Sequence, residues 1–233
     1  MSRRNVALSP RVEDTRDKQS SNVVSFSLTE IKEHFDQNIA AIHNQFDVAH
    51  SLRDSGREVD EKNIYRSQIV FLESALDFYL HELNKYGLRQ IFDGNWEKTD
   101  RYNNLKIPMK HFEEGLREHE SSEWFLQYVN DAYSRDVFTS YISMNDQMNT
   151  LGLNITDLCK DIFPPSSDPA VPSKTAKSVI MDLFNRRNQI AHQTDRAHAD
   201  AVQTDIAEAY VLLCISDVET IVATLHNAAM RKG

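Results

Sequence analysis

The sequence has few of the residues that build β-rich, disulfide-stabilised or membrane-spanning proteins. Six glycines in 233 residues leave few positions for the tight turns of a β-rich fold. The two cysteines, Cys159 and Cys214, lie far apart among apolar residues, so we expect core fillers in a reducing compartment, not a disulfide or a zinc site. No apolar run has the length of a membrane span, and the N-terminal segment lacks a signal-peptide core. These absences favour a soluble, cytoplasmic protein without membrane contact.

Positive charge is also scarce, since the formal net charge is −9. An acidic chain is a poor non-specific binder of nucleic acids, because the phosphate backbone attracts basic surfaces. One segment departs from this balance. Residues 174–196 contain two acids, Asp182 and Asp195, and five basic residues: Lys174, Lys177, Arg186, Arg187 and Arg196.

The apolar residues recur at spacings of three and four, which predicts helices. Ser27 and Glu30 form a capping box before a helix predicted over 28–54. A second helix is predicted over 60–86, closed by Gly87 as a cap. Its apolar stripe is broad, as in the interior of a bundle. Glu73 and Asp77 lie four residues apart on this helix, facing either the site or, by default, solvent.

The rest of the chain predicts shorter helices and then two long ones. After an irregular stretch, helices are expected at about 108–119, 121–133, 135–149 and 154–163. Their aromatic residues follow helical spacing without interleaved basic residues, which favours core packing over base stacking. The segment 164–173 holds four prolines and is predicted to be a loop. Long helices follow at about 174–191 and 200–230.

The expected architecture is all-α. Two long early helices and two long late helices predict an up-and-down four-helix bundle, with 88–163 as a helical insertion between its halves. Residues 1–22 are polar without periodicity, which predicts a mobile tail. We expect residues 23–233 to form a single domain.

The basic island contains the sequence RNQIAH, from Arg187 to His192. On a continuous helix, five residues turn the chain by about 140° net, so this arginine and histidine would not share a face. They converge only if the helix ends near Ala191 or if a second subunit supplies one of them.

These side chains suit cleavage of RNA through the ribose 2′-hydroxyl. Histidine has a reference pKa near neutrality and serves as an acid or base. Arginine offers a permanent charge and a planar fork for phosphate oxygens, and Asn188 adds a neutral hydrogen bond. This scheme requires no metal or other cofactor, and the sequence has no convincing metal-ligand cluster.

The segment RRNQIAH resembles the R-N-x-x-x-H signature of the HEPN superfamily, which comprises small helical bundles found in toxins, CRISPR effectors and anti-phage systems. RSQIVFLESALDFYLHEL is similar to an early core helix of HEPN families, including RiboL-PSP-HEPN, though this likeness is less specific. The resemblance covers residues 28–87 and 174–230.

What the resemblance implies is a homodimer whose two motifs face each other across a cleft and cut single-stranded RNA without metal. Arg187, Asn188 and His192 carry over as catalytic residues, and Arg186 is assigned a supporting contact to the phosphate of the substrate. His198 stands outside the motif and is interpreted as a solvated loop residue. The biological setting implied is a toxin or defence effector, with an antitoxin or defence protein as partner.

Two alternatives stay open at this point. Arg187 can instead pair with an acid or cap carbonyl groups, with His192 favoured by the dipole at the helix C-terminus. The whole protein can instead be a non-catalytic HEPN-like module that binds RNA, a nucleotide or another protein. The RNA target, the activating signal and the role of 88–163 are not encoded in any pattern we recognise.

Overall fold

The structure, a computed structural model, describes residues 23–118, 121–133, 137–166, 168, 170, 172–196 and 201–232, and this part of the chain is all-helical. The predicted all-α class is confirmed. Within these ranges the only β pairing is an isolated antiparallel bridge between Arg196 and Gln203. The tail predicted over 1–22 and the loop residue His198 lie outside the described residues.

The helices are α1 (Leu28–Asp54), α2 (Glu58–Phe92), α3 (Asp100–Asn103), α4 (Met109–Arg117), α5 (Glu123–Tyr133), α6 (Tyr141–Thr150), α7 (Ile155–Leu158), α8 (Ala176–Gln193) and α9 (Glu208–Met230). The bounds of α1 agree with the predicted ones. Its capping box is present: the Ser27 hydroxyl accepts a hydrogen bond from Glu30 N at 3.3 Å, and Glu30 Oε2 accepts one from Ser27 N at 2.7 Å. The predicted apolar stripe of α1 is buried in the core.

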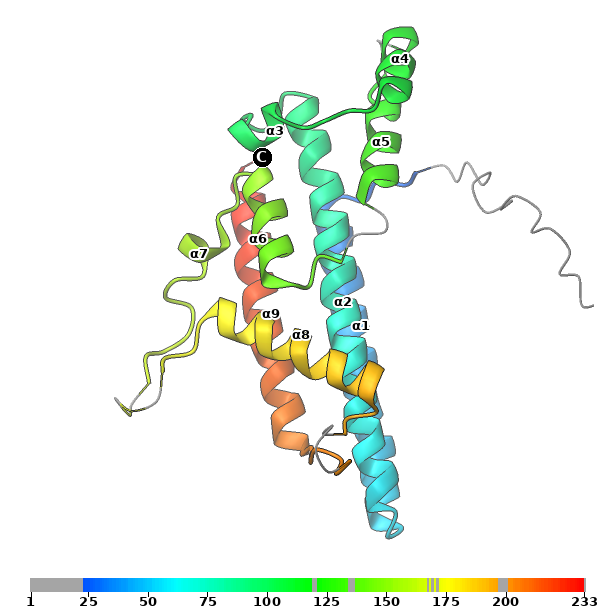
Figure 1. Cartoon of the computed structure of the whole chain (residues 1–233), viewed down its shortest axis with the longest axis vertical. Helices are drawn as coiled ribbons and strands as arrows, with labels where there is room; N and C mark the ends of the chain where they lie inside the picture. Colours follow the sequence, from blue (N-terminus) through cyan, green and yellow to red (C-terminus); the bar gives the residue numbers. More distant parts are fainter. Residues whose placement is uncertain are drawn as a thin grey trace, which may run out of the picture.

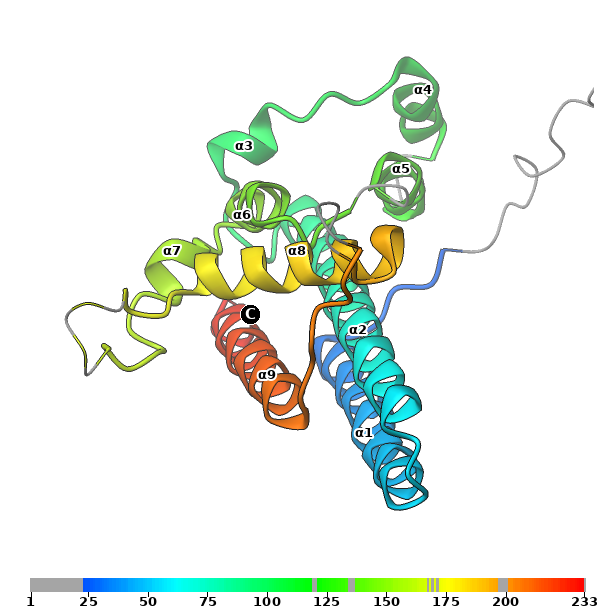
Figure 2. The same ribbon diagram turned by 60° about the horizontal axis from the view of Figure 1, so that its bottom comes forward.

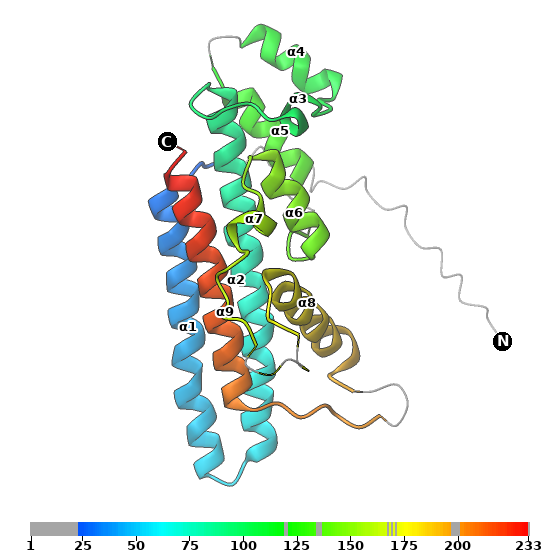
Figure 3. The same ribbon diagram turned by 90° about the vertical axis from the view of Figure 1, so that its left-hand side faces the viewer.

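Three long helices, α1, α2 and α9, lie side by side along the long axis of the molecule (Figures 1 and 3). The fourth long helix, α8, lies across them, in contact with both α2 and α9 (Figures 1 and 2). The predicted up-and-down arrangement of four helices is therefore not confirmed. Because α8 crosses α2, only part of its length is buried against the core, and no residue of the helix after Leu183 is buried.

The predicted cap at Gly87 is wrong, because α2 continues through this residue to Phe92. Gly87 is buried, and a Cβ atom there would lie 2.8 Å from the Leu151 methyl groups and 2.9 Å from the Trp96 ring. The glycine therefore marks the place where the middle segment packs closely on α2, not the end of the helix.

The middle segment packs on the C-terminal half of α2 through α5 and α6, and α4 packs on α5 (Figure 3). Its aromatic residues lie in or against the core, as predicted: Phe125, Tyr128 and Phe138 are buried, and Trp124, Tyr133 and Tyr141 are partly buried. Both cysteines are free thiols. Burial raises the pKa of each thiol to about 11, which disfavours the thiolate; Cys159 lies in the core and Cys214 packs against it.

Among the described helices, α9 alone is long and apolar enough, by length and composition, to cross a membrane. This is weak evidence, since the core helix of a soluble protein passes the same test. One face of α9 lies in the core against α1 and α2, and contributes the buried residues Val211, Ile215, Val218, Ile221, Val222 and Leu225.

Candidate active site

The RNQIAH motif lies entirely within α8. This helix begins with a capping box between Thr175 and Ser178 and remains helical to Gln193. The helix end near Ala191 that would bring the two motif side chains together is therefore not present. Arg187 and His192 keep the separation of about 140° around the axis that a continuous helix imposes.

The Arg187 side chain is partly buried and is held by two contacts. Its Nε atom lies 3.2 Å from Glu73 Oε2 on α2, an ion-pair distance without hydrogen-bond alignment. Its Nη1 atom donates a hydrogen bond to Asn188 Oδ1 at 3.0 Å. With 30% of the side chain exposed, the guanidinium is positioned but still open to a ligand.

Arg187 lies at the edge of a cavity of about 420 Å³ between α2 and α5. Ligand pockets in proteins typically have volumes of about 300–1,000 Å³. The residues of α2 that line it are Glu73, Ser74, Asp77, Phe78, His81, Glu82, Asn84 and Lys85. Val129, Asn130, Tyr133 and Val137 form the opposite wall.

The interpretation that Glu73 faces solvent is wrong, because this side chain is only 3% exposed. Burial raises the pKa of the Glu73 carboxyl above its ordinary value. A hydrogen bond that Thr139 Oγ1 donates at 2.5 Å and the charge of Arg187 oppose this shift without cancelling it. The Arg187–Glu73 pair therefore joins a half-exposed cation to a buried carboxyl group. Burial disfavours the charged form of this carboxyl group.

Asp77, the other acid of this pair on α2, is half-buried and also lines the cavity. Its Oδ1 atom accepts a hydrogen bond from Phe138 N at 2.9 Å, and its Oδ2 atom lies 3.6 Å from His81 Nε2. The His81 ring stacks on Phe138 with 4.1 Å between ring centroids. These contacts fasten the start of the α6 segment to α2 beside the cavity.

His192 is exposed on the last turn of α8 and does not line this cavity. The structure therefore joins Arg187 to Asn188 by a hydrogen bond, and leaves the imidazole about 140° around the helix axis from Arg187. In one chain, the three predicted catalytic residues do not form one site.

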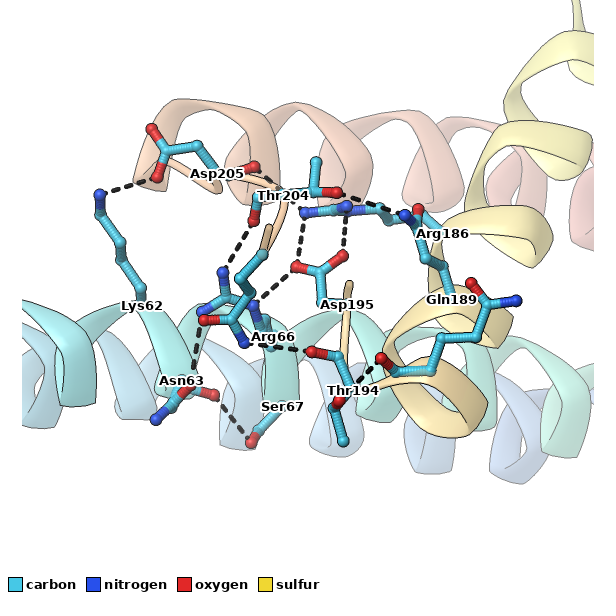
Figure 4. Close-up of polar contacts among 12 residues, drawn as sticks. Lys62, Asn63, Arg66, Ser67, Arg186, Gln189, Thr194, Asp195, Thr204 and Asp205 are labelled. Carbon is cyan, nitrogen blue, oxygen red and sulfur yellow. Dashed lines mark hydrogen bonds and ion pairs between the residues drawn. The ribbon is translucent and has the colours of Figure 1, made fainter. Parts of the chain in front are cut away.

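Arg186 is placed quite differently from its neighbour. Its two Nη atoms form a pair of hydrogen bonds with both carboxylate oxygens of Asp195, at 2.5 and 2.9 Å (Figure 4). Asp195 is fully buried and also accepts a hydrogen bond from Arg66 Nε on α2, at 2.6 Å. Both Nη atoms of Arg186 thus bind a carboxylate inside the protein, and the predicted contact of Arg186 to a substrate phosphate forms no part of the proposed site.

The chain turns sharply at Asp195, just after α8 ends. Thr194 and Asp195 both have left-handed backbone conformations, with φ values of 50° and 60°. The Asp195 carbonyl accepts a hydrogen bond from Thr204 N at 2.7 Å, and Arg66 Nη2 donates one to the Thr204 carbonyl at 2.8 Å (Figure 4). We call Arg66, Arg186 and Asp195 the anchor, since these residues fix the end of α8 to α2.

Sequence reasoning missed the functions of Glu73 and Asp195. The sequence feature that indicates an ion pair at Asp195 is its position, because this acid directly follows the end of a basic helix. Glu73 gave no comparable signal, because nothing in its surroundings along the chain distinguishes it from an exposed acid.

Comparisons of the chain with known protein families, with characterised proteins and with solved structures find no match. In the part of the chain that the structure describes, no group of three or more His, Cys, Asp or Glu side chains is placed to hold a metal ion.

Proposed function

We propose that the protein is a HEPN-like endoribonuclease that cuts single-stranded RNA without metal and acts as a homodimer. The observation that carries this proposal is the division of the motif on α8. Arg187 lines a cavity, and His192 is exposed on another face of the same continuous helix. A second copy of the chain is then needed to set an imidazole against an arginine.

The exposed face of α8 supports a dimer contact through this helix. Met181, Asn185, Asn188 and His192 follow each other at spacings of four, three and four, and therefore form one stripe along the helix. Met181 is 43% exposed, and Asn185 and His192 are exposed. Packing of two such stripes about a two-fold axis would place each His192 against the α8 helix of the other copy.

In the proposed reaction, His192 removes the proton from a ribose 2′-hydroxyl, and the 2′-oxygen attacks the adjacent phosphorus atom. The bond to the 5′-oxygen breaks, this oxygen takes up a proton from water, and the imidazolium of His192 releases its proton to solvent. The products are a 2′,3′-cyclic phosphate and a 5′-hydroxyl. Arg187 supports the negative charge of the phosphorane, and Asn188 adds a hydrogen bond. The setting we propose is a cytoplasmic toxin or anti-phage effector restrained by a partner protein.

One observation favours the alternative, a non-catalytic binding module. The charge of Arg187 is partly neutralised by Glu73, and this ion pair accounts for the arginine as a structural residue. A catalytic function requires that the guanidinium still reach a phosphate while it is held by Glu73.

The test is cleavage of unstructured RNA in the presence of EDTA. We expect wild type to cut, and Arg187→Ala and His192→Ala each to cut about 10²–10⁴-fold more slowly while they remain folded and dimeric. Matched controls are Arg117→Ala on α4 and His43→Ala on α1, two exposed positions far from the motif in sequence. These controls should cut as wild type does.

Mixing the two inactive variants tests the dimer itself. A heterodimer of Arg187→Ala with His192→Ala retains one intact Arg187 and one intact His192, on different chains. If the site pairs the arginine of one chain with the histidine of the other, mixing restores a measurable part of the wild-type rate. Unchanged cutting by both single variants would contradict the nuclease proposal, and an inactive mixture would contradict the shared site.

A further inference from the structure

The cavity beside Arg187 is not a phosphate site. Three carboxyl groups line it, from Glu73, Asp77 and Glu82, and the basic groups among its lining residues are held by them. Lys85 forms an ion pair with Glu82 at 2.8 Å, and Arg187 lies 3.2 Å from Glu73. A phosphate would meet net repulsion here, while a neutral ligand that donates hydrogen bonds would not.

Asn84 is the feature of the cavity that the proposed chemistry does not use. Its side chain is 1% exposed and lines the cavity, and neither Nδ2 nor Oδ1 has a hydrogen-bond partner among the described residues. An unpaired buried polar group costs about 1–3 kcal/mol, so such a group is retained where a ligand or an ordered water completes it. The amide presents one donor and one acceptor side by side.

The cavity also has the room and the apolar lining to take a ring. On α2 it runs from Glu73 to Lys85, twelve residues, which corresponds to about 18 Å along the helix axis. Phe78, Val129 and Val137 supply apolar walls between the polar groups. Arg187 lies at the Glu73 end and Asn84 near the Lys85 end, about 16 Å away along the helix axis, so a ring held by Asn84 and a phosphate at the guanidinium would belong to different nucleotides of one strand.

We infer that this cavity binds a nucleobase of the RNA, preferentially one with an exocyclic amino group. An Asn side chain recognises a base by a paired donor and acceptor, and carboxylates accept hydrogen bonds from amino groups of bases. Asn84 pairs with the edge of the base, and the carboxyl groups disfavour uracil, which has no amino group to donate. That this base belongs to an RNA substrate rests on the proposed function.

The test is binding of single nucleotides to the full chain. We expect AMP, CMP and GMP to bind about tenfold more tightly than UMP, the effect of one well-placed polar contact to a base. Asn84→Ala should weaken the binding of AMP, CMP and GMP about tenfold. Asn38→Ala, at an exposed position on α1 outside the cavity, is the matched control and should change nothing.

A second variant guards against misfolding of the first. Val137 is 54% exposed at the cavity wall, so Val137→Trp obstructs the cavity without disturbing the core. Ile142→Trp, at a 76% exposed position on α6, is its control. We expect the first to reduce binding of all four nucleotides and the second to have no effect. Wild-type binding by both Asn84→Ala and Val137→Trp would overturn the inference, as would the absence of any nucleotide binding up to about 10 mM.

The two proposals fail separately. If wild type cuts RNA and its base preference is the same in Asn84→Ala, the base site is wrong and the nuclease stands. If wild type binds nucleotides through Asn84 but is inert on RNA, the base site stands and the nuclease is wrong.

Discussion

Two adjacent arginines on α8 show how different the two sides of this helix are. Arg186 and Arg187 lie about 100° apart around the axis, on either side of the apolar stripe that packs on the core. Arg186 is 11% exposed and forms two parallel hydrogen bonds with a fully buried carboxylate. Arg187 is 30% exposed and forms one ion pair at the edge of a cavity.

One side of α8 therefore holds the helix in place, and the other side is open to a ligand. On the Arg186 side, every strong contact is internal, so the anchor holds α8 in place and offers nothing to a ligand. On the Arg187 side, the guanidinium has remaining hydrogen-bond donors and a neighbouring cavity. A helix that crosses a bundle benefits from such a fixed side, because the last turns of α8 contribute no buried residue to the core.

The largest effect on stability is expected from Asp195→Ala. This change leaves Arg66 and Arg186 without their shared carboxylate, and removal of one partner from a buried ion pair typically costs about 3–5 kcal/mol. The free energy of unfolding, measured by urea denaturation, should fall by this amount. Asp182→Ala is the control, since Asp182 is an exposed acid on the same helix, and it should shift the free energy by less than about 0.5 kcal/mol. Equal effects of the two changes would mean that the anchor does not stabilise the fold.

Lysine substitutions at the two arginines sharpen the comparison directly. Arg186→Lys keeps the charge but loses the paired hydrogen bonds, and should lower the free energy of unfolding by about 1.5–3 kcal/mol. Arg187→Lys should lower it by less than about 1 kcal/mol, because its ion pair is half-exposed. For RNA cleavage we expect the opposite order, with a loss of about tenfold or more for Arg187→Lys alone, at temperatures where both variants are folded. A reversed pattern would exchange the functions assigned to the two arginines.

Local sequence was sufficient to predict the four long helices, with errors of up to eight residues at their ends, and insufficient to predict how they pack. The bounds of α1 follow from its capping box and its regular stripe, both of which depend on neighbours within four residues. The crossing of α8 depends on the anchor, whose members Arg66 and Asp195 are 129 residues apart. Gly87 shows the same limit, because its partners Trp96 and Leu151 are brought to it by the fold and not by the pattern around it.

The candidate site divides in the same way. RNQIAH is a local motif, and the types of its side chains and their angular spacing on a helix are contained in six residues. Glu73 and Asn84, which define the environment of Arg187 and the cavity, lie on α2, more than 100 residues earlier. Since a buried acid and an exposed acid look alike in an isolated sequence, the default assumption of solvent exposure failed for Glu73.

The smallest effect concerns the Arg187 side and depends on pH. Burial raises the folded-state pKa of Glu73 above its value in the unfolded chain, so the folded protein holds the proton more tightly. Stability from this group is therefore present at low pH and is lost as the pH rises through the folded pKa.

Glu73→Gln removes the ionisation, and leaves Arg187 half-exposed and hydrated, not buried and unpaired. We expect the variant to be more stable than wild type by up to about 1 kcal/mol near pH 7, with the difference vanishing toward about pH 4. Urea denaturation across this range measures it, with Glu113→Gln on the exposed face of α4 as the control. A Gln variant that is less stable than wild type near neutral pH would show that the Arg187–Glu73 ion pair stabilises the fold as the anchor does, and the contrast between the two arginines would lose its basis.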